Sequence, residues 1–85
     1  MIAAARMRHA AASIPEQDAR ILRSLASGGV TVAIVSDETA WGKTWRMWRY
    51  AGHELASARH AFDRYAWPGQ RLYQQREPGQ WTEVT

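Results

Sequence analysis

Apolar positions recur at helical spacing in the first third of the chain. Ile14, Ile21, Leu22 and Leu25 fall on one side of a helix drawn over residues 14–27, while polar residues occupy the other sides. The pattern therefore predicts an amphipathic helix over 14–27, with its apolar face directed at a core.

Both ends of this helix carry recognisable signals. Ser13 and Glu16 have the spacing of a capping box, in which each side chain bonds the backbone of the other, and Pro15 is tolerated in a first turn. Gly28 and Gly29 follow the last apolar position and offer a left-handed stop. We therefore expect the helix to begin at the capping box and to end before the glycines.

The next apolar run, residues 30–35 (VTVAIV), is rich in β-branched side chains. Such side chains lose rotamer freedom in a helix and suit a buried strand, so we expect a strand here. Ser36, Asp37 and Glu38 then form either a turn or a helix cap, and Gly42 interrupts the element that follows.

Helical periodicity returns at His53 and stops before Pro68. The apolar positions, at steps of three, four and three, are Leu55, Ala58, Phe62 and Tyr65. This amphipathic helix should pack on a sheet.

The C-terminal segment alternates around a turn. RLYQQR at 71–76 and WTEVT at 81–85 flank Glu77-Pro78-Gly79-Gln80, in which proline and glycine preset the central dihedral angles of a four-residue turn. We expect a C-terminal β-hairpin.

Together these elements predict an α+β fold: an N-terminal helix, a β-hairpin, a second helix and a C-terminal β-hairpin, with one small antiparallel sheet packed by the helices. Residues 1–85 should form a single domain, because so short a chain supports one core, and residues 1–12 are either a separate short helix or a frayed end. The expected core consists of Ile21, Leu22, Leu25, Val32, Ile34, Trp45, Leu55, Phe62, Leu72 and Trp81.

Residues 41–50 (WGKTWRMWRY) interleave aromatic rings with basic side chains and allow two interpretations. As a strand paired with 30–35, the segment places alternate residues on opposite faces: Trp45, Met47 and Arg49 on one, and Arg46, Trp48 and Tyr50 on the other. One face could then offer rings and arginines to single-stranded nucleic acid. Alternatively, the two helices cover both faces and bury both sets.

As a helix, the same segment aligns Trp41, Trp45 and Trp48 in one stripe. The chain then resembles a winged helix-turn-helix, with ARILRSLASGG as first helix, TVAIVSDETAW as second, GKTWRMWRYAG as recognition helix and RYAWPGQRLYQQR around the wing. The resemblance implies a DNA-binding surface that comprises Lys43, Thr44, Arg46, Met47 and Arg49 in the major groove and Arg64 and Arg71 on phosphates. The sequence departs from that family in its β-branched second helix.

The charge is unevenly distributed. The net charge is +3 and ten of the eleven basic residues are arginine, which makes forked bonds to phosphate or carboxylate. Seven basic residues lie between Lys43 and Arg76, against only Glu54 and Asp63. A solvated basic face or an anionic partner would each explain this excess.

Motifs for catalysis and metal binding are missing from the sequence. His53 and His60 would lie about 10 Å apart on one helix, too far to share a metal ion, and no phosphate loop, nucleophile elbow or HExxH run occurs. We therefore expect no enzyme, no metal and no cofactor. Because the sequence has neither cysteine nor a long apolar run, we expect a cytoplasmic protein that does not bind membranes.

The sequence thus favours a small basic binding protein, most simply a nucleic-acid-binding or regulatory one that recognises DNA or RNA through an Arg/Trp-rich surface. The alternative is a protein-binding inhibitor or adaptor that meets an acidic protein surface, for example a phage-encoded blocker of host machinery of the anti-CRISPR kind. A homodimer would be another way to bury the aromatics. The candidate binding residues are Lys43, Arg46, Trp48, Arg49, Tyr50, Arg64, Arg71 and Tyr73.

Overall fold

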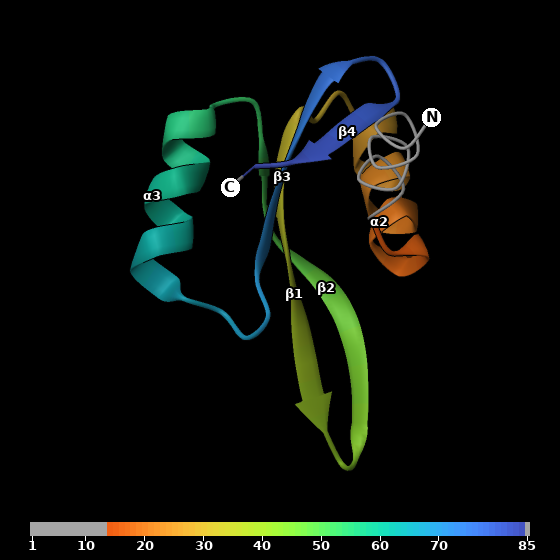
Figure 1. Cartoon of the computed structure of the whole chain (residues 1–85), viewed down its shortest axis with the longest axis vertical. Helices are drawn as coiled ribbons and strands as arrows, with labels where there is room; N and C mark the ends of the chain where they lie inside the picture. Colours follow the sequence, from red (N-terminus) through yellow and green to blue (C-terminus); the bar gives the residue numbers. More distant parts are fainter. Residues whose placement is uncertain (1–13, 85) are drawn as a thin grey trace, which may run out of the picture.

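Four antiparallel strands form one sheet in the computed structural model of the protein, which describes residues 14–84 (Figure 1). The elements are α2 (Glu16–Ser27), β1 (Val32–Ala40), β2 (Lys43–Gly52), α3 (Leu55–Tyr65), β3 (Arg71–Glu77) and β4 (Gln80–Glu83). The strands lie in the order β2-β1-β3-β4, so β1 and β3 are central although β2 and α3 separate them in the chain. The predicted α+β fold, with its two helices and two hairpins, is confirmed.

The two helices cover opposite faces of the sheet (Figure 1). On the α2 face, Leu22 packs with Ala33, Val35 and Tyr73. On the α3 face, the corresponding cluster comprises Val32, Ile34, Ala58 and Leu72. Because successive residues of a strand point to opposite faces, the unbroken apolar run at the start of β1 fills both clusters.

The predicted N-terminal helix is present, but it starts two residues later than expected. Pro15 occupies the N-cap position with an extended backbone and no side-chain capping bond, and Ser13, on which the expected capping box depends, lies outside the described residues. At the other end, Gly29 has the positive φ of 88° that a left-handed stop requires, and the backbone N–H of Gly28 donates to the carbonyl of Leu25 at 3.0 Å.

The first hairpin corrects one expectation and decides between two alternatives. Ser36–Glu38, expected to form a turn or a helix cap, lies inside β1, and residues 43–50 form the strand of the first interpretation, not the helix of the second. The reversal occurs at Trp41 and Gly42, whose φ angles of 51° and 74° are both positive. A two-residue turn of this kind matches the right-handed twist of its strands, which explains why β1 continues as far as the turn.

A β-bulge alters the alternation expected for β2. The register shifts between Ile34, which pairs with Tyr50, and Val35, which pairs with Trp48, so that Arg49 has no partner opposite. As a result, Tyr50 packs against the α3-face cluster and does not share a face with Trp48. The predicted grouping of Trp48 with Tyr50 is therefore wrong.

Most of the expected core is confirmed, with one clear exception. Trp45 remains 42% exposed because the distal half of the β1–β2 hairpin extends beyond both helices (Figure 1). Leu22, Val32, Ile34 and Leu72 are buried, while Ile21, Leu25, Leu55, Phe62 and Trp81 pack against them partly buried. Ala33, Val35 and Tyr73 are fully buried core residues that the sequence pattern did not single out.

The packing predicts a contrast between two apolar substitutions. Leu22→Ala should lower the free energy of unfolding by about 3 kcal/mol, because it empties a buried site. Trp41→Ala should change it by less than about 0.5 kcal/mol, because that ring is exposed. Urea denaturation followed by circular dichroism measures both values, and equal losses in the two variants would contradict this account of the core.

Candidate functional site

The part of the β1–β2 hairpin that projects from the fold, residues 37–48, is here called the hairpin arm (Figure 1). Three tryptophans lie along it: Trp41 at the turn is 93% exposed, Trp48 is 52% exposed and Trp45 is 42% exposed. Lys43 is exposed beside the turn. The arm therefore exposes aromatic rings at its turn and on both of its faces, with the basic side chain of Lys43 near its tip.

A buried carboxylate anchors the sheet to α2 near the base of the arm. Asp18 is 0% exposed, and Arg71 donates to its two oxygens from Nε at 2.9 Å and Nη2 at 2.8 Å. The hydroxyl of Tyr73 donates to Asp18 Oδ2 at 2.5 Å. Because Arg71 and Tyr73 lie opposite Val35 and Ala33 in the sheet, both side chains point toward α2.

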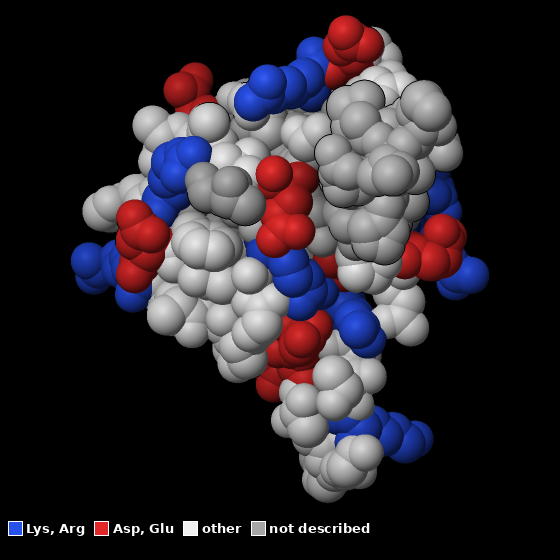
Figure 2. Space-filling model, in the orientation of Figure 1, with Lys and Arg blue, Asp and Glu red and all other residues white. Residues whose placement is uncertain are grey.

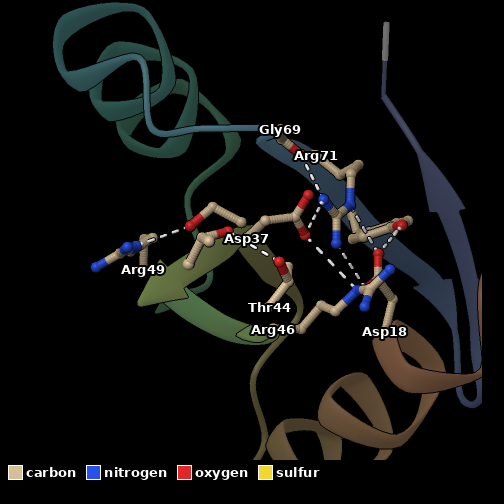
Figure 3. Close-up of polar contacts among 10 residues, drawn as sticks. Asp18, Asp37, Thr44, Arg46, Arg49, Gly69 and Arg71 are labelled. Atoms are coloured by element: carbon tan, nitrogen blue, oxygen red, sulfur yellow. Dashed lines mark hydrogen bonds and ion pairs between the residues drawn. The ribbon is translucent and has the colours of Figure 1, made fainter. Parts of the chain in front are cut away.

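The same guanidinium reaches the hairpin arm (Figure 3). Arg71 Nη1 donates to Asp37 Oδ1 at 2.9 Å and also to the carbonyl of Gly69. The Nε of Arg46 lies 3.6 Å from the same oxygen, Asp37 Oδ1. Arg71 thus joins α2, the loop before β3 and the arm in one network.

The network shifts the ionisation of its buried members. Burial by itself would raise the pKa of Asp18, but hydrogen bonds from Arg71 and Tyr73 and the charge of Arg71 outweigh it and hold that pKa below its ordinary value. Burial, together with the Asp18 carboxylate, raises the pKa of the Tyr73 hydroxyl. At neutral pH the network therefore contains a charged Asp18 and a neutral Tyr73.

On the α3 face, Arg49 braces the arm in a similar way. It donates from Nε to the hydroxyl of Ser36 at 2.8 Å and from Nη2 to Glu38 Oε1 at 2.6 Å. Its guanidinium carbon also lies 5.9 Å from the centre of the Trp67 ring, within range of a cation–π interaction.

Trp67 continues this contact toward the end of α3. Its ring stacks on that of Tyr65 with centroids 4.9 Å apart, and the guanidinium of Arg64 lies 5.7 Å from the centre of the Tyr65 ring. Tyr65 is 57% exposed. The resulting aromatic–arginine cluster connects α3 to the base of the arm.

The described residues carry almost balanced charge. Residues 14–84 hold nine Lys and Arg side chains against eight Asp and Glu, so most of the excess positive charge of the chain comes from Arg6 and Arg8. In the view of Figure 2, basic and acidic side chains alternate over the surface and do not gather in one basic patch. The excess of basic residues between Lys43 and Arg76 is thus offset by acids from outside that stretch.

The structure separates the eight candidate binding residues into three groups. Lys43 and Trp48 are exposed or half-exposed on the arm, and Arg64 lies in the last turn of α3. Tyr50 packs against the α3-face core, and Tyr73 is buried. The three remaining residues form ion pairs within the protein: Arg46 with Asp37, Arg49 with Glu38, and Arg71 with Asp18 and Asp37.

Trp41 and Asp18 are absent from the candidate residues that the sequence suggested. The pair Trp41-Gly42 fits a two-residue hairpin turn, which would have placed the indole at an exposed tip. Asp18 is four residues after Ile14 and four before Leu22, on the apolar side of its helix, and an acidic residue in that position signals a buried partner.

Comparison with known proteins does not assign a function to this geometry. No protein-family model, curated protein or solved structure matches the chain. Within residues 14–84, no cluster of three or more His, Asp or Glu side chains could hold a metal ion. Neither helix in the same range is long and apolar enough to cross a bilayer.

The buried ion pair predicts a pH-dependent stability. Asp18→Asn should lower the free energy of unfolding at pH 7 by about 3 kcal/mol, because it leaves Arg71 without its buried counter-charge. Since the folded-state pKa of Asp18 is lowered, its contribution is complete above the ordinary carboxyl pKa of about 4 and is lost as the pH falls through the folded-state value. Denaturation curves from pH 7 to pH 3 should therefore converge for the two proteins, and a constant difference would contradict the assignment.

Proposed function

We propose that the protein is a non-enzymatic binding module that acts through the hairpin arm and that its partner is a protein. The observation that carries this proposal is the exposure of Trp41, Trp45 and Trp48 on one projecting hairpin whose neighbouring arginines are already paired. Tryptophan is among the residues most enriched at the energetic centres of protein interfaces.

The size of an indole makes this exposure significant. Burying the roughly 200 Å² of one fully exposed tryptophan would contribute about 5 kcal/mol before the costs of association are counted. Trp41 offers nearly this whole area, and Trp48 and Trp45 each add about half of it.

The base of the arm is held before any partner arrives. On the α2 face Asp37 is bound by Arg71, and on the α3 face Arg49 is bonded to Ser36 and Glu38. A surface ordered in advance loses less conformational entropy on binding, which increases the affinity obtained from the same contacts.

A protein partner suits this surface better than nucleic acid. Phosphate would have to compete with Glu38 for Arg49 and with Asp18 and Asp37 for Arg71, and those hydrogen bonds are between 2.6 and 2.9 Å long. Contact between a protein partner and the exposed rings breaks none of these hydrogen bonds.

Nucleic acid remains the second candidate because one observation favours it. The aromatic–arginine cluster of Arg49, Trp67, Tyr65 and Arg64 combines stacked rings with guanidinium groups, and Tyr65 is exposed. Rings of this kind beside cationic groups form stacking sites for single-stranded bases in other proteins.

Among protein binders, the role of an inhibitor or adaptor fits a small module without catalytic motifs. A phage-encoded blocker of host machinery, of the anti-CRISPR kind, is one such role, which we offer as an analogy at the level of size and class. The cytoplasmic location and the homodimer expected from the sequence stay part of this proposal.

The partner class is tested by affinity capture from a cell lysate after nuclease treatment, followed by reconstitution with the purified captured protein. Complex formation should survive the nuclease and should weaken at least about tenfold in Trp41→Ala and Trp48→Ala, because each removes an exposed anchor. Tyr65→Ala is the matched control, since it removes an exposed ring outside the arm. Light scattering on the isolated protein reveals whether a second copy is the partner.

A salt titration tests the second candidate. Fluorescence anisotropy with a labelled single-stranded oligonucleotide should show weak binding at moderate salt. Tight binding that falls steeply with salt and depends on Arg64 and Tyr65 would instead overturn the choice of a protein partner, because such a slope measures phosphate neutralisation.

A further inference from the structure

A small hollow lies where the start of α2 meets β2. Its volume is about 260 Å³, and its walls come from both elements: Gln17, Arg20, Ile21, Thr44, Trp45 and Arg46. Because Trp45 also belongs to the hairpin arm, the hollow is continuous with the proposed binding surface. This hollow is here called the notch.

The lining of the notch combines apolar and cationic groups. Ile21 provides apolar surface, whereas Arg20 from α2 and Arg46 from β2 bring two guanidinium groups. No Asp or Glu lies among the lining residues. Such a site favours a short side chain that carries a negative charge.

Both arginines retain hydrogen-bonding capacity. Arg20 Nε lies 3.7 Å from Glu16 and Arg46 Nε lies 3.6 Å from Asp37, so each carboxylate gives electrostatic balance without a short hydrogen bond. Arg46 Nε itself is buried, but about a third of the side chain is exposed, so an incoming carboxylate would meet the terminal nitrogens of this guanidinium. In Arg49, by contrast, the Nη2 nitrogen already makes a short hydrogen bond of 2.6 Å to Glu38.

We propose that the notch receives an Asp or Glu side chain of the protein partner that covers the hairpin arm. The carboxylate would accept hydrogen bonds from Arg20 and Arg46, while the adjoining part of the partner would cover Ile21. This inference rests on the proposed function for its partner, and it adds the chemistry by which an acidic protein surface is recognised.

The test uses a defined probe in place of the unidentified partner. The dipeptide acetyl-Asp-Phe-amide is titrated into the ¹⁵N-labelled protein and compared with acetyl-Asn-Phe-amide, which has the same shape without the charge. The acidic probe should shift the backbone N–H of Thr44 and the side-chain amide of Gln17, with at least about tenfold higher affinity than the neutral probe, because its hydrogen bonds are charge-assisted.

Two charge reversals on α2 provide a matched comparison. Arg20 and Arg23 are both exposed and both pair with Glu16, but only Arg20 lines the notch. Arg20→Glu should abolish the preference for the acidic probe, and Arg23→Glu should preserve it. If the two variants had equal effects, or if the two probes bound equally well, the proposal that the notch receives a carboxylate would be overturned.

The result separates the notch from the proposed function. Suppose that Trp41→Ala loses the protein partner but the protein shows no preference for the acidic dipeptide. The arm would then remain the binding surface, and the carboxylate site in the notch would be refuted. Suppose instead that the protein prefers the acidic dipeptide but Trp41→Ala leaves capture of the partner unchanged. The notch would then be supported as an anion site, and the arm would be refuted as the binding surface.

Discussion

The ion pair between Asp18 and Arg71 is the interaction on which the arrangement of the whole molecule depends. Its carboxylate is fully buried and its three hydrogen bonds come from two side chains of one strand. A buried charge without such partners would be strongly unfavourable, so α2 can pack on this face in only one register. Through Asp37, the same guanidinium also fixes the hairpin relative to the helix.

This use of charge determines what the surface can offer to a partner. Three of the basic residues between Lys43 and Arg76, namely Arg46, Arg49 and Arg71, are directed inward or along the sheet, where Asp18, Asp37 and Glu38 neutralise them. The indoles of the arm extend past the helices and stay uncovered (Figure 1). The protein therefore presents rings with scattered charge, and recognition by shape and apolar contact becomes more favourable than attraction to a polyanion.

The hairpin must also avoid unwanted pairing. β2 is an edge strand of ten residues, which could template association with another sheet. The bulge opposite Ile34 and Val35 and the arginines along β2 oppose such pairing, because a twisted and charged edge aligns poorly with a second strand. The opposite edge, β4, is only four residues long. The exposed rings can thus serve binding with a reduced risk of edge-to-edge aggregation.

The sequence by itself determined the elements. Helical spacing in 14–27 and 55–65, β-branched residues in 30–35 and the Pro-Gly turn at 78–79 are local signals, and each produced the element it predicts. Only the tertiary structure decided the faces and the partners. A bulge moved Tyr50 to the core, and Asp18, 53 residues before Arg71 in the chain, neutralised an arginine that appeared free. Periodicity reports which residues share a side of one element, whereas ion pairing and exposure depend on which elements meet, and that is set by packing across the whole chain.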